Sequence, residues 1–349
     1  MSQTLQNVKP GKPWQPSAKQ RVTDFTILFA AVLTSYLIVE FTAMKGKLAY
    51  FFLFFLALAI FNLIRGTITR DFMNGSDQFF SVIMLLGMTL VVIPTADILY
   101  TVFERGRKGL HAGLLTNDMA MATPSDPITS GGLLHAIIGT FLLVSVALIL
   151  SVPIGILTAL YLTEIKGRFT RPIRFLVQAM SGVPSIVAGL FILSSIVYTI
   201  TKSYSGFVGS LALTILMIPT IARTAEEVLN LIPNDLREAG VALGGTQWRT
   251  VAMVVIPAAR SGLITALILG VARIVGETAP ILLLTGGGDA VNFNPTSGAM
   301  GSLPFYIWKS FLLGTEESIT RGWAGLLVLL VLVLILFIMA RVLGSRRTK

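Results

Sequence analysis

The chain has 349 residues, of which 54% are hydrophobic and only 13% are charged, and it contains no cysteine. Soluble domains carry about 25% charged residues, so the composition excludes an ordinary soluble enzyme, and the missing thiols exclude disulfides and thiolate metal sites. The formal charge of +10 does not indicate nucleic-acid binding, because the basic residues are scattered near the ends of apolar runs instead of forming one patch.

Long apolar runs predict an all-α polytopic membrane protein, because a β-barrel would show short alternating segments instead. A basic, proline-rich tail is expected over residues 1–22, with no cleavage site after it, so the first span should act as an uncleaved anchor. A short connection joins the first two spans and predicts a transmembrane hairpin within 23–75. The eight predicted spans are 24–43, 48–64, 79–103, 133–162, 173–200, 206–222, 262–284 and 323–343.

Lysine and arginine are more frequent in the segments on the side of the N-terminus, which predicts that both termini are cytoplasmic. The cluster Arg105-Gly106-Arg107-Lys108 opposes this bias, but it lies in a longer loop, where the rule weakens. The outer loop 285–322 contains an amphipathic segment, Leu303–Leu313. We expect this segment to pack over the mouth of a pathway or to receive a soluble partner.

Arg273 and Glu277 lie in the middle of the seventh apolar run. A charge at the centre of a span costs roughly 2.5–3.5 kcal/mol on insertion scales, so such residues normally face a bundle interior or a wet pathway. One helical turn separates the two side chains, so they could form an intrahelical salt bridge that locks packing. Alternatively, the guanidinium could bind an oxyanion with paired hydrogen bonds while Glu277 holds it in place. The residues alone leave both interpretations open.

The segment Gly182-Val183-Pro184-Ser185 interrupts the fifth run. It predicts either a proline kink with small residues for packing, or a broken helix whose freed backbone groups and Ser185 line a pathway. Isolated ionisable residues elsewhere are expected to reach water at span ends, or to lack the partners that a metal site needs. They are Glu40, Asp97, His111 and His135.

The inner loop 223–261 has a helical and charged pattern. Asp235-Leu236-Arg237-Glu238 has the form of a capping box, so a helix is predicted over 235–243, and Gly244-Gly245 should end it. Thr246 is expected to cap a second helix, from Gln247 to Val255, which Pro257 would interrupt. A short projecting helix of this kind could seal the bundle, or it could be a lever held by a cytoplasmic protein.

Motifs in this loop resemble the EAA loop of ABC-transporter permeases. They are Glu238-Ala239-Gly240, then Leu243-Gly244, then, after nine intervening residues, Val254-Val255-Ile256-Pro257. The family's usual third residue is alanine, and Gly240 in its place costs about 1 kcal/mol of helix propensity. Gly182–Phe191, Ile218–Glu227 and Ala272–Pro280 narrow the resemblance to the phosphate-specific permeases, and Gly276-Glu277-Thr278-Ala279-Pro280 is similar to the PstA subunits.

The resemblance implies a type I ABC-importer permease domain over 76–345, with a six-helix core to which the N-terminal pair of spans is added. In the family, the arginine that matches Arg273 is associated with phosphate passage. The candidate pathway residues are Arg273, Glu277, Thr278 and Ser185. The candidate residues for coupling to an ATPase are Asp235, Arg237, Glu238, Ala239, Gly240, Leu243 and Gly244.

The sequence contains no P-loop motif, so the chain is predicted to be a non-catalytic subunit without a cofactor, and a partner would use ATP and Mg²⁺. The resemblance implies a PstC-type sister permease, two PstB-type ATPases and a PstS-type periplasmic phosphate-binding protein, in a bacterial inner membrane. A permease for another oxyanion, such as molybdate, tungstate or phosphonate, is the alternative. A secondary transporter or channel that works without ATP would favour an inverted internal repeat, which the sequence does not show.

Overall fold

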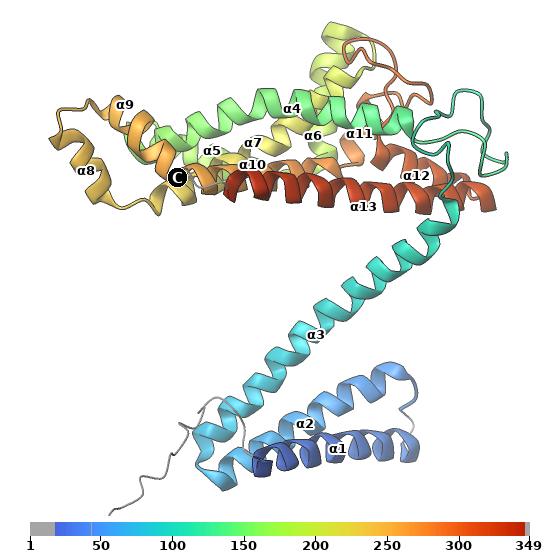
Figure 1. The fold of residues 1–349 in the computed structure, drawn as a ribbon, viewed down its shortest axis with the longest axis vertical. Helices are drawn as coiled ribbons and strands as arrows, with labels where there is room; N and C mark the ends of the chain where they lie inside the picture. Colours follow the sequence, from blue (N-terminus) through green and yellow to red (C-terminus); the bar gives the residue numbers. More distant parts are fainter. Residues whose placement is uncertain (1–17, 43, 346–349) are drawn as a thin grey trace, which may run out of the picture. The chain divides into compact units, whose positions relative to one another are not determined.

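The computed structural model describes residues 18–42 and 44–345, which are mostly helical (Figure 1). Most of the predicted tail, residues 1–17, lies outside the described residues. The chain divides into two compact units, Met1–Leu99 and Tyr100–Lys349. α3 (Phe72–Gly106) begins in the first unit and ends in the second.

The first unit contains α1 (Ala18–Phe41), α2 (Lys47–Thr69) and most of α3. α1 and α2 pack against each other around a cluster of phenylalanine and alanine side chains. An ion pair between Arg65 and Asp24 joins the two helices. At the corner between α2 and α3, a Cβ on Gly66 would lie 2.5 Å from the Cα of Gly75. The two backbones therefore meet closely because neither residue has a side chain.

The second unit is built around α7 (Gly206–Asn230). Two thirds of its apolar span is buried, against a third or less for the other candidate spans. α7 lies between α4 (Leu134–Leu160) and α10 (Ile256–Val275), and α10 also packs on α13 (Glu316–Ser345) (Figure 1). Small residues allow this close approach, since a Cβ on Gly155 of α4 would meet Ile221 of α7 at 2.8 Å.

Seven helices of the described residues are long and apolar enough to cross a membrane, or up to eight if one bent pair counts as a span. The all-α polytopic prediction is therefore confirmed. Helix ends differ from the predicted boundaries, because hydropathy marks the apolar part of a helix and misses polar turns beyond it. α3 begins at Phe72 instead of residue 79, and α7 continues to Asn230 instead of residue 222.

Two predicted spans are broken helices. The fifth forms α5 (Thr170–Ser181) and α6 (Ser185–Ile192), which a π-helical segment continues to Thr201, and the chain bends by 104° between the two halves. The bend lies just before Ser185, where Pro184 lacks an N–H and restricts the residue before it. In the seventh span, α10 ends at Val275 and the chain resumes as α11 (Ala279–Leu284). The expectation of one continuous seventh helix is therefore wrong.

One end of the second unit carries the predicted amphipathic segment, which forms α12 (Leu303–Leu313) with the expected bounds. We call this the α12 end. Arg321, near the start of α13, is only 2% exposed and orders the loop beside it. Its guanidinium donates at 2.8–3.2 Å to the carbonyl oxygens of Thr123, Pro124, Asp126, Pro127 and Ser130.

We expect Arg321→Gln to release the loop 123–130. Hydrogen bonds from a charged donor contribute about 1.5–3 kcal/mol each, so the variant should lose at least about 3 kcal/mol of local stability. Limited proteolysis of the purified protein should show cleavage in this loop at least about tenfold faster. Lys309→Gln is the control, because its ion pair with Asp289 is partly exposed and contributes little. Equal cleavage of Arg321→Gln and the unmodified protein would show that Arg321 does not hold the loop.

Candidate functional site

Arg273 lies in the last turn of α10 and reaches across to α7. Its Nη1 donates to the Oγ1 of Thr220 over 3.2 Å, and its side chain is exposed in this chain. Within residues 18–42 and 44–345, no carboxylate is in ion-pair contact with Arg273. A neutral hydroxyl therefore orients the guanidinium and leaves its positive charge uncompensated.

Glu277 lies outside the helix that carries Arg273. Gly276 is the C-cap of α10, and the N–H of Glu277 donates to the carbonyl of Ile274 at 3.2 Å in a tight turn. The intrahelical salt bridge, one of the two interpretations of this pair, is therefore wrong. A spacing of four residues places two side chains on one face only where the helix continues through both, and this helix ends between them.

The two broken spans meet through their second halves. α6 packs on α11, and a Cβ on Gly189 would lie 2.9 Å from the Cα of Pro280. Ser185 is the first residue of α6, and Thr278 directly precedes α11. Of the two forms predicted for Gly182-Val183-Pro184-Ser185, the proline kink and the broken helix, the chain adopts the broken helix. The predicted roles of Ser185, Glu277 and Thr278 along a pathway stay predictions.

The opposite end of the second unit carries α8 (Asn234–Ala242) and α9 (Gln247–Thr250), and we call it the α8 end (Figure 1). The predicted capping box is wrong, because the helix begins one residue earlier, after Pro233, and no side chain caps it. The predicted glycine stop is confirmed. Gly244 has φ +84°, its N–H donates to Val241, and the N–H of Gly245 donates to Gly240, which is a Schellman motif.

The second helix of this loop does not stop at Pro257. α9, a π-helical turn (Val251–Val255) and α10 form one continuous helix from Gln247 to Val275. Proline cannot donate to the preceding turn, and the wider π turn accommodates that missing bond. Thr246 caps the start as predicted, since its hydroxyl accepts from the N–H of Arg249. The interruption expected at Pro257 is therefore wrong.

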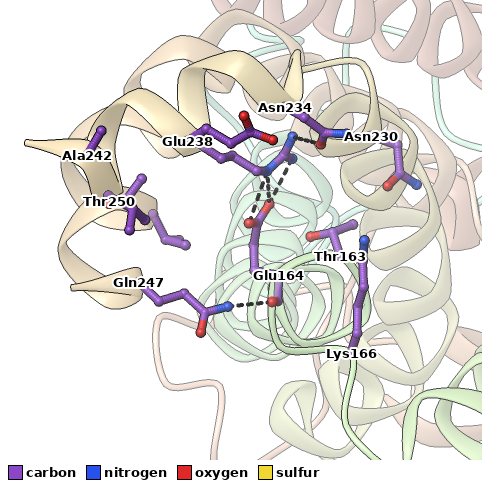
Figure 2. Close-up of a pocket in the computed structure, with 12 residues that line it drawn as sticks. Thr163, Glu164, Lys166, Asn230, Asn234, Glu238, Ala242, Gln247 and Thr250 are labelled. Carbon is purple, nitrogen blue, oxygen red and sulfur yellow. Dashed lines mark hydrogen bonds and ion pairs between the residues drawn. The ribbon is translucent and has the colours of Figure 1, made fainter. Parts of the chain in front are cut away.

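Arg237 turns inward and joins three elements at the α8 end. Its Nε and Nη2 lie 2.9–3.1 Å from the carboxylate of Glu164, which is in the π-helical turn that continues α4 (Tyr161–Ile165). Its Nη1 and Nη2 also donate to the carbonyls of Ile232 and Leu229, at the end of α7, at 2.6 and 2.9 Å. Gln247 donates to the carbonyl of Glu164 at 2.7 Å (Figure 2). We call Glu164, Arg237 and Gln247 the clasp.

The candidate coupling residues therefore divide between two faces of α8. Arg237 and Gly240 face the bundle, whereas Asp235, Glu238 and Ala239 are exposed. Leu243, at 90% exposure, and Leu236, at 42%, present apolar side chains to solvent. We call Leu236, Ala239 and Leu243 the grip face, because their spacing places them on one side of the helix. Sequence reasoning missed Leu236, although its helical spacing from Ala239 and Leu243 could have indicated it.

Gly240 is the residue at which the loop departs from the usual EAA pattern. A Cβ there would lie 2.5 Å from Cγ2 and 2.9 Å from Oγ1 of Thr250, a buried residue. The glycine therefore lets α8 approach the start of the next helix. Glycine in place of the family's usual alanine thus has a packing role in addition to its cost in helix propensity. Sequence analysis missed Thr250, because nothing in the local pattern pairs it with Gly240.

We expect Gly240→Ala to destabilise the α8 end by about 1–3 kcal/mol, the usual cost of overpacking. Thr250→Ala in the same chain should recover most of the loss, since it removes the two atoms that a new methyl group would meet most closely and leaves only the Cβ of residue 250, at 3.2 Å. Thermal denaturation of the purified protein checks this with the two single variants and the double variant. Additive losses in the double variant would show that the two residues do not compete for one space.

The remaining ionisable residues named from the sequence do not gather into a site. His111 contacts the carbonyls of Gly109 and Gly131, and His135 packs edge-on against Tyr306. In the part of the chain that the structure describes, no group of three or more His, Asp or Glu side chains could hold a metal ion. Asp97 and Glu40 are exposed on α3 and α1.

Comparison with known proteins places the second unit in a family. The family model "Binding-protein-dependent transport system inner membrane component" matches residues 151–349. The chain is 38% identical over 246 residues to "Phosphate transport system permease protein PstA 1" of Mycobacterium tuberculosis (strain ATCC 25618 / H37Rv), covering 70% of this chain and 79% of the relative. It is 38% identical over 255 residues to "Phosphate transport system permease protein PstA" of Pasteurella multocida (strain Pm70), covering 72% and 88%.

Among solved structures, an inward-facing form of the MetNI methionine ABC transporter is similar. The TM-score is 0.47 at 22% sequence identity, and the match covers 60% of this chain and 92% of that chain.

Proposed function

This chain belongs to the family of binding-protein-dependent transport system inner membrane components, and we propose that it is the PstA-type permease subunit of an ATP-driven phosphate importer. It would form half of the translocation pathway in a bacterial inner membrane, with the α8 end and both termini in the cytoplasm. The α12 end would face the periplasm.

The uncompensated charge of Arg273 carries this proposal. A guanidinium matches the oxygens of phosphate with paired hydrogen bonds, and its binding energy is greatest where no carboxylate competes. Thr220 holds Arg273 from the neighbouring helix at 3.2 Å without neutralising it. The broken ends at Ser185 and Thr278 would supply further polar groups along the same pathway, because a break in a helix frees backbone donors and acceptors.

The partners follow from the family. A PstC-type sister permease would complete the pathway, because one bundle of this size does not enclose it alone. A PstS-type periplasmic protein would deliver phosphate at the α12 end. Two PstB-type ATPases would supply the energy, and one of them would bind the grip face of α8. ATP-driven movement of α8 would then switch the bundle between outward and inward access.

The test is phosphate uptake by the complete complex in proteoliposomes. Radiolabelled phosphate should enter only when ATP is present, and excess molybdate, tungstate or a phosphonate should compete weakly. Strong competition by one of these anions would show that the pathway carries that oxyanion instead of phosphate. Uptake without ATP would favour a secondary transporter or channel.

A further inference from the structure

We propose that Glu164 is a positioning residue, which binds Arg237 so that α8 and the ends of α4 and α7 move as one body. Movement of α8 would then reach Arg273 along α7. This inference rests on the proposed function, because it describes how the lever of that transporter is connected.

α8 has little apolar packing against the bundle. An open cavity of about 680 Å³ lies behind it, and both apolar side chains (Val241 and Val251) and polar ones (Lys166, Asn230 and Asn234) line it (Figure 2). No residue of α8 is fully buried. Apolar packing therefore cannot hold this helix firmly. Its connection to the bundle depends on the contact of Gly240 with Thr250 and on the clasp.

Removing one partner of the clasp is costly, because its charges are largely shielded from water. The side chain of Glu164 is only 7% exposed and that of Arg237 is 21% exposed. Both carboxylate oxygens of Glu164 accept from the guanidinium. In such a shielded pair, removing one partner leaves the other charge buried and unpaired, which is far more costly than breaking a surface ion pair.

The remaining donors of Arg237 extend the clasp to α7. Leu229 is in the last turn of that helix and Ile232 lies two residues beyond its end, and the carbonyl groups at a helix C-terminus favour a positive charge. One guanidinium thus joins α8 to α4 through Glu164 and to α7 through these carbonyls. Gln247 adds the start of the helix that leads into α10.

α7 connects the clasp to Arg273. Thr220, which accepts from Arg273, and Leu229, which accepts from Arg237, lie on the same helix. The distance between them along the axis is about 14 Å at ~1.5 Å per residue. A helix transmits a displacement over such a distance as a rigid element. A shift of α8 would therefore alter the position of the hydroxyl that orients Arg273.

The test compares Glu164→Gln with unmodified protein in the complete, reconstituted complex. The ATPase subunits should still co-purify, since the grip face is unchanged, but phosphate transported per ATP hydrolysed should fall at least about tenfold. Arg237→Gln should do the same, and the double variant should be no worse than either single variant, because the two residues act as a unit.

Glu226→Gln is the matched control. Glu226 is also a shielded carboxylate near this end of α7, but its ion pair is with Arg174 of α5 and does not involve α8. Its transport per ATP should stay within about twofold of the unmodified protein. A tenfold loss in Glu226→Gln, or none in Glu164→Gln, would overturn the proposal. Failure of the proposed function would look different, since the unmodified complex itself would not import phosphate.

A second measurement needs no substitution in the clasp. The chain has no cysteine, so Val241→Cys on α8 and Leu157→Cys on α4, which are 55% and 58% exposed, can carry spin labels. The distance between the labels should change by less than about 2 Å between the ATP-free and the ATP-trapped complex, as for helices that move together. A larger change would show that α8 moves independently of α4 and would overturn the proposal.

Discussion

Arg273→Gln should reduce phosphate uptake by about a hundredfold while the complex remains assembled. Paired charge-assisted hydrogen bonds from a guanidinium contribute about 3 kcal/mol, and 1.4 kcal/mol corresponds to a factor of ten. Glutamine keeps a polar side chain that can still contact Thr220, so the fold should tolerate the change. Uptake into proteoliposomes measures the effect, and size-exclusion chromatography verifies assembly.

Arg260→Gln provides the control for this experiment. Arg260 is also exposed on α10, about 20 Å nearer the α8 end at ~1.5 Å per residue, and it should retain uptake within about threefold. Arg273→Lys separates charge from geometry, because a lysine keeps the positive charge but lacks the planar guanidinium that makes paired hydrogen bonds. We expect it to recover only part of the uptake. Normal uptake by Arg273→Gln would contradict the role proposed for this residue.

Replacing the two leucines of the grip face, Leu236→Glu with Leu243→Glu, should release the ATPase subunits from the permease. Both side chains are exposed, so the substitutions remove an apolar surface without disturbing the core. Burying a leucine contributes about 1.5–3 kcal/mol, and burying a carboxylate in its place is unfavourable. The loss should exceed about a hundredfold in ATPase binding, measured by co-purification and by uptake.

Leu312→Glu, on α12 at the other end of the unit, is the matched control, since that leucine is 67% exposed and lies far from α8. It should leave ATPase co-purification unchanged. If the grip-face variant keeps its ATPases and its turnover, α8 is not the helix that they hold. The clasp variants and the grip-face variant thus separate two properties of one helix, since the first should uncouple an assembled complex and the second should dissociate it.

Some of the site could be read from local patterns. The Schellman stop at Gly244-Gly245, the cap at Thr246 and the helix Leu303–Leu313 each depend on residues within a few positions of one another, and each is confirmed. The helix start at Asp235 was predicted wrongly, although it is also local. The helix begins one residue earlier, directly after Pro233, and no side chain caps it.

The partners of the charged residues could not be read in this way. Arg237 is one of the seven candidate coupling residues in the sequence, and only the fold brings it to Glu164, which is far away in the sequence. Pairing of Arg273 with Glu277, one of the two interpretations that the sequence allows, requires a continuous helix, and the break after Val275 separates the two residues. Thr220 was within a motif that the sequence indicated, but its contact with Arg273 joins two different helices.

The sequence by itself determined the membrane class, the apolar spans and the family, because these follow from composition, hydropathy over a helix length and motifs read in order. Only the tertiary structure decided which face of α8 points inward, where the fifth and seventh spans break, and which group holds Arg273. The physical reason is that a buried charge takes its partner from whatever the packed helices bring within hydrogen-bond distance. That distance is set by contacts between residues far apart in the chain.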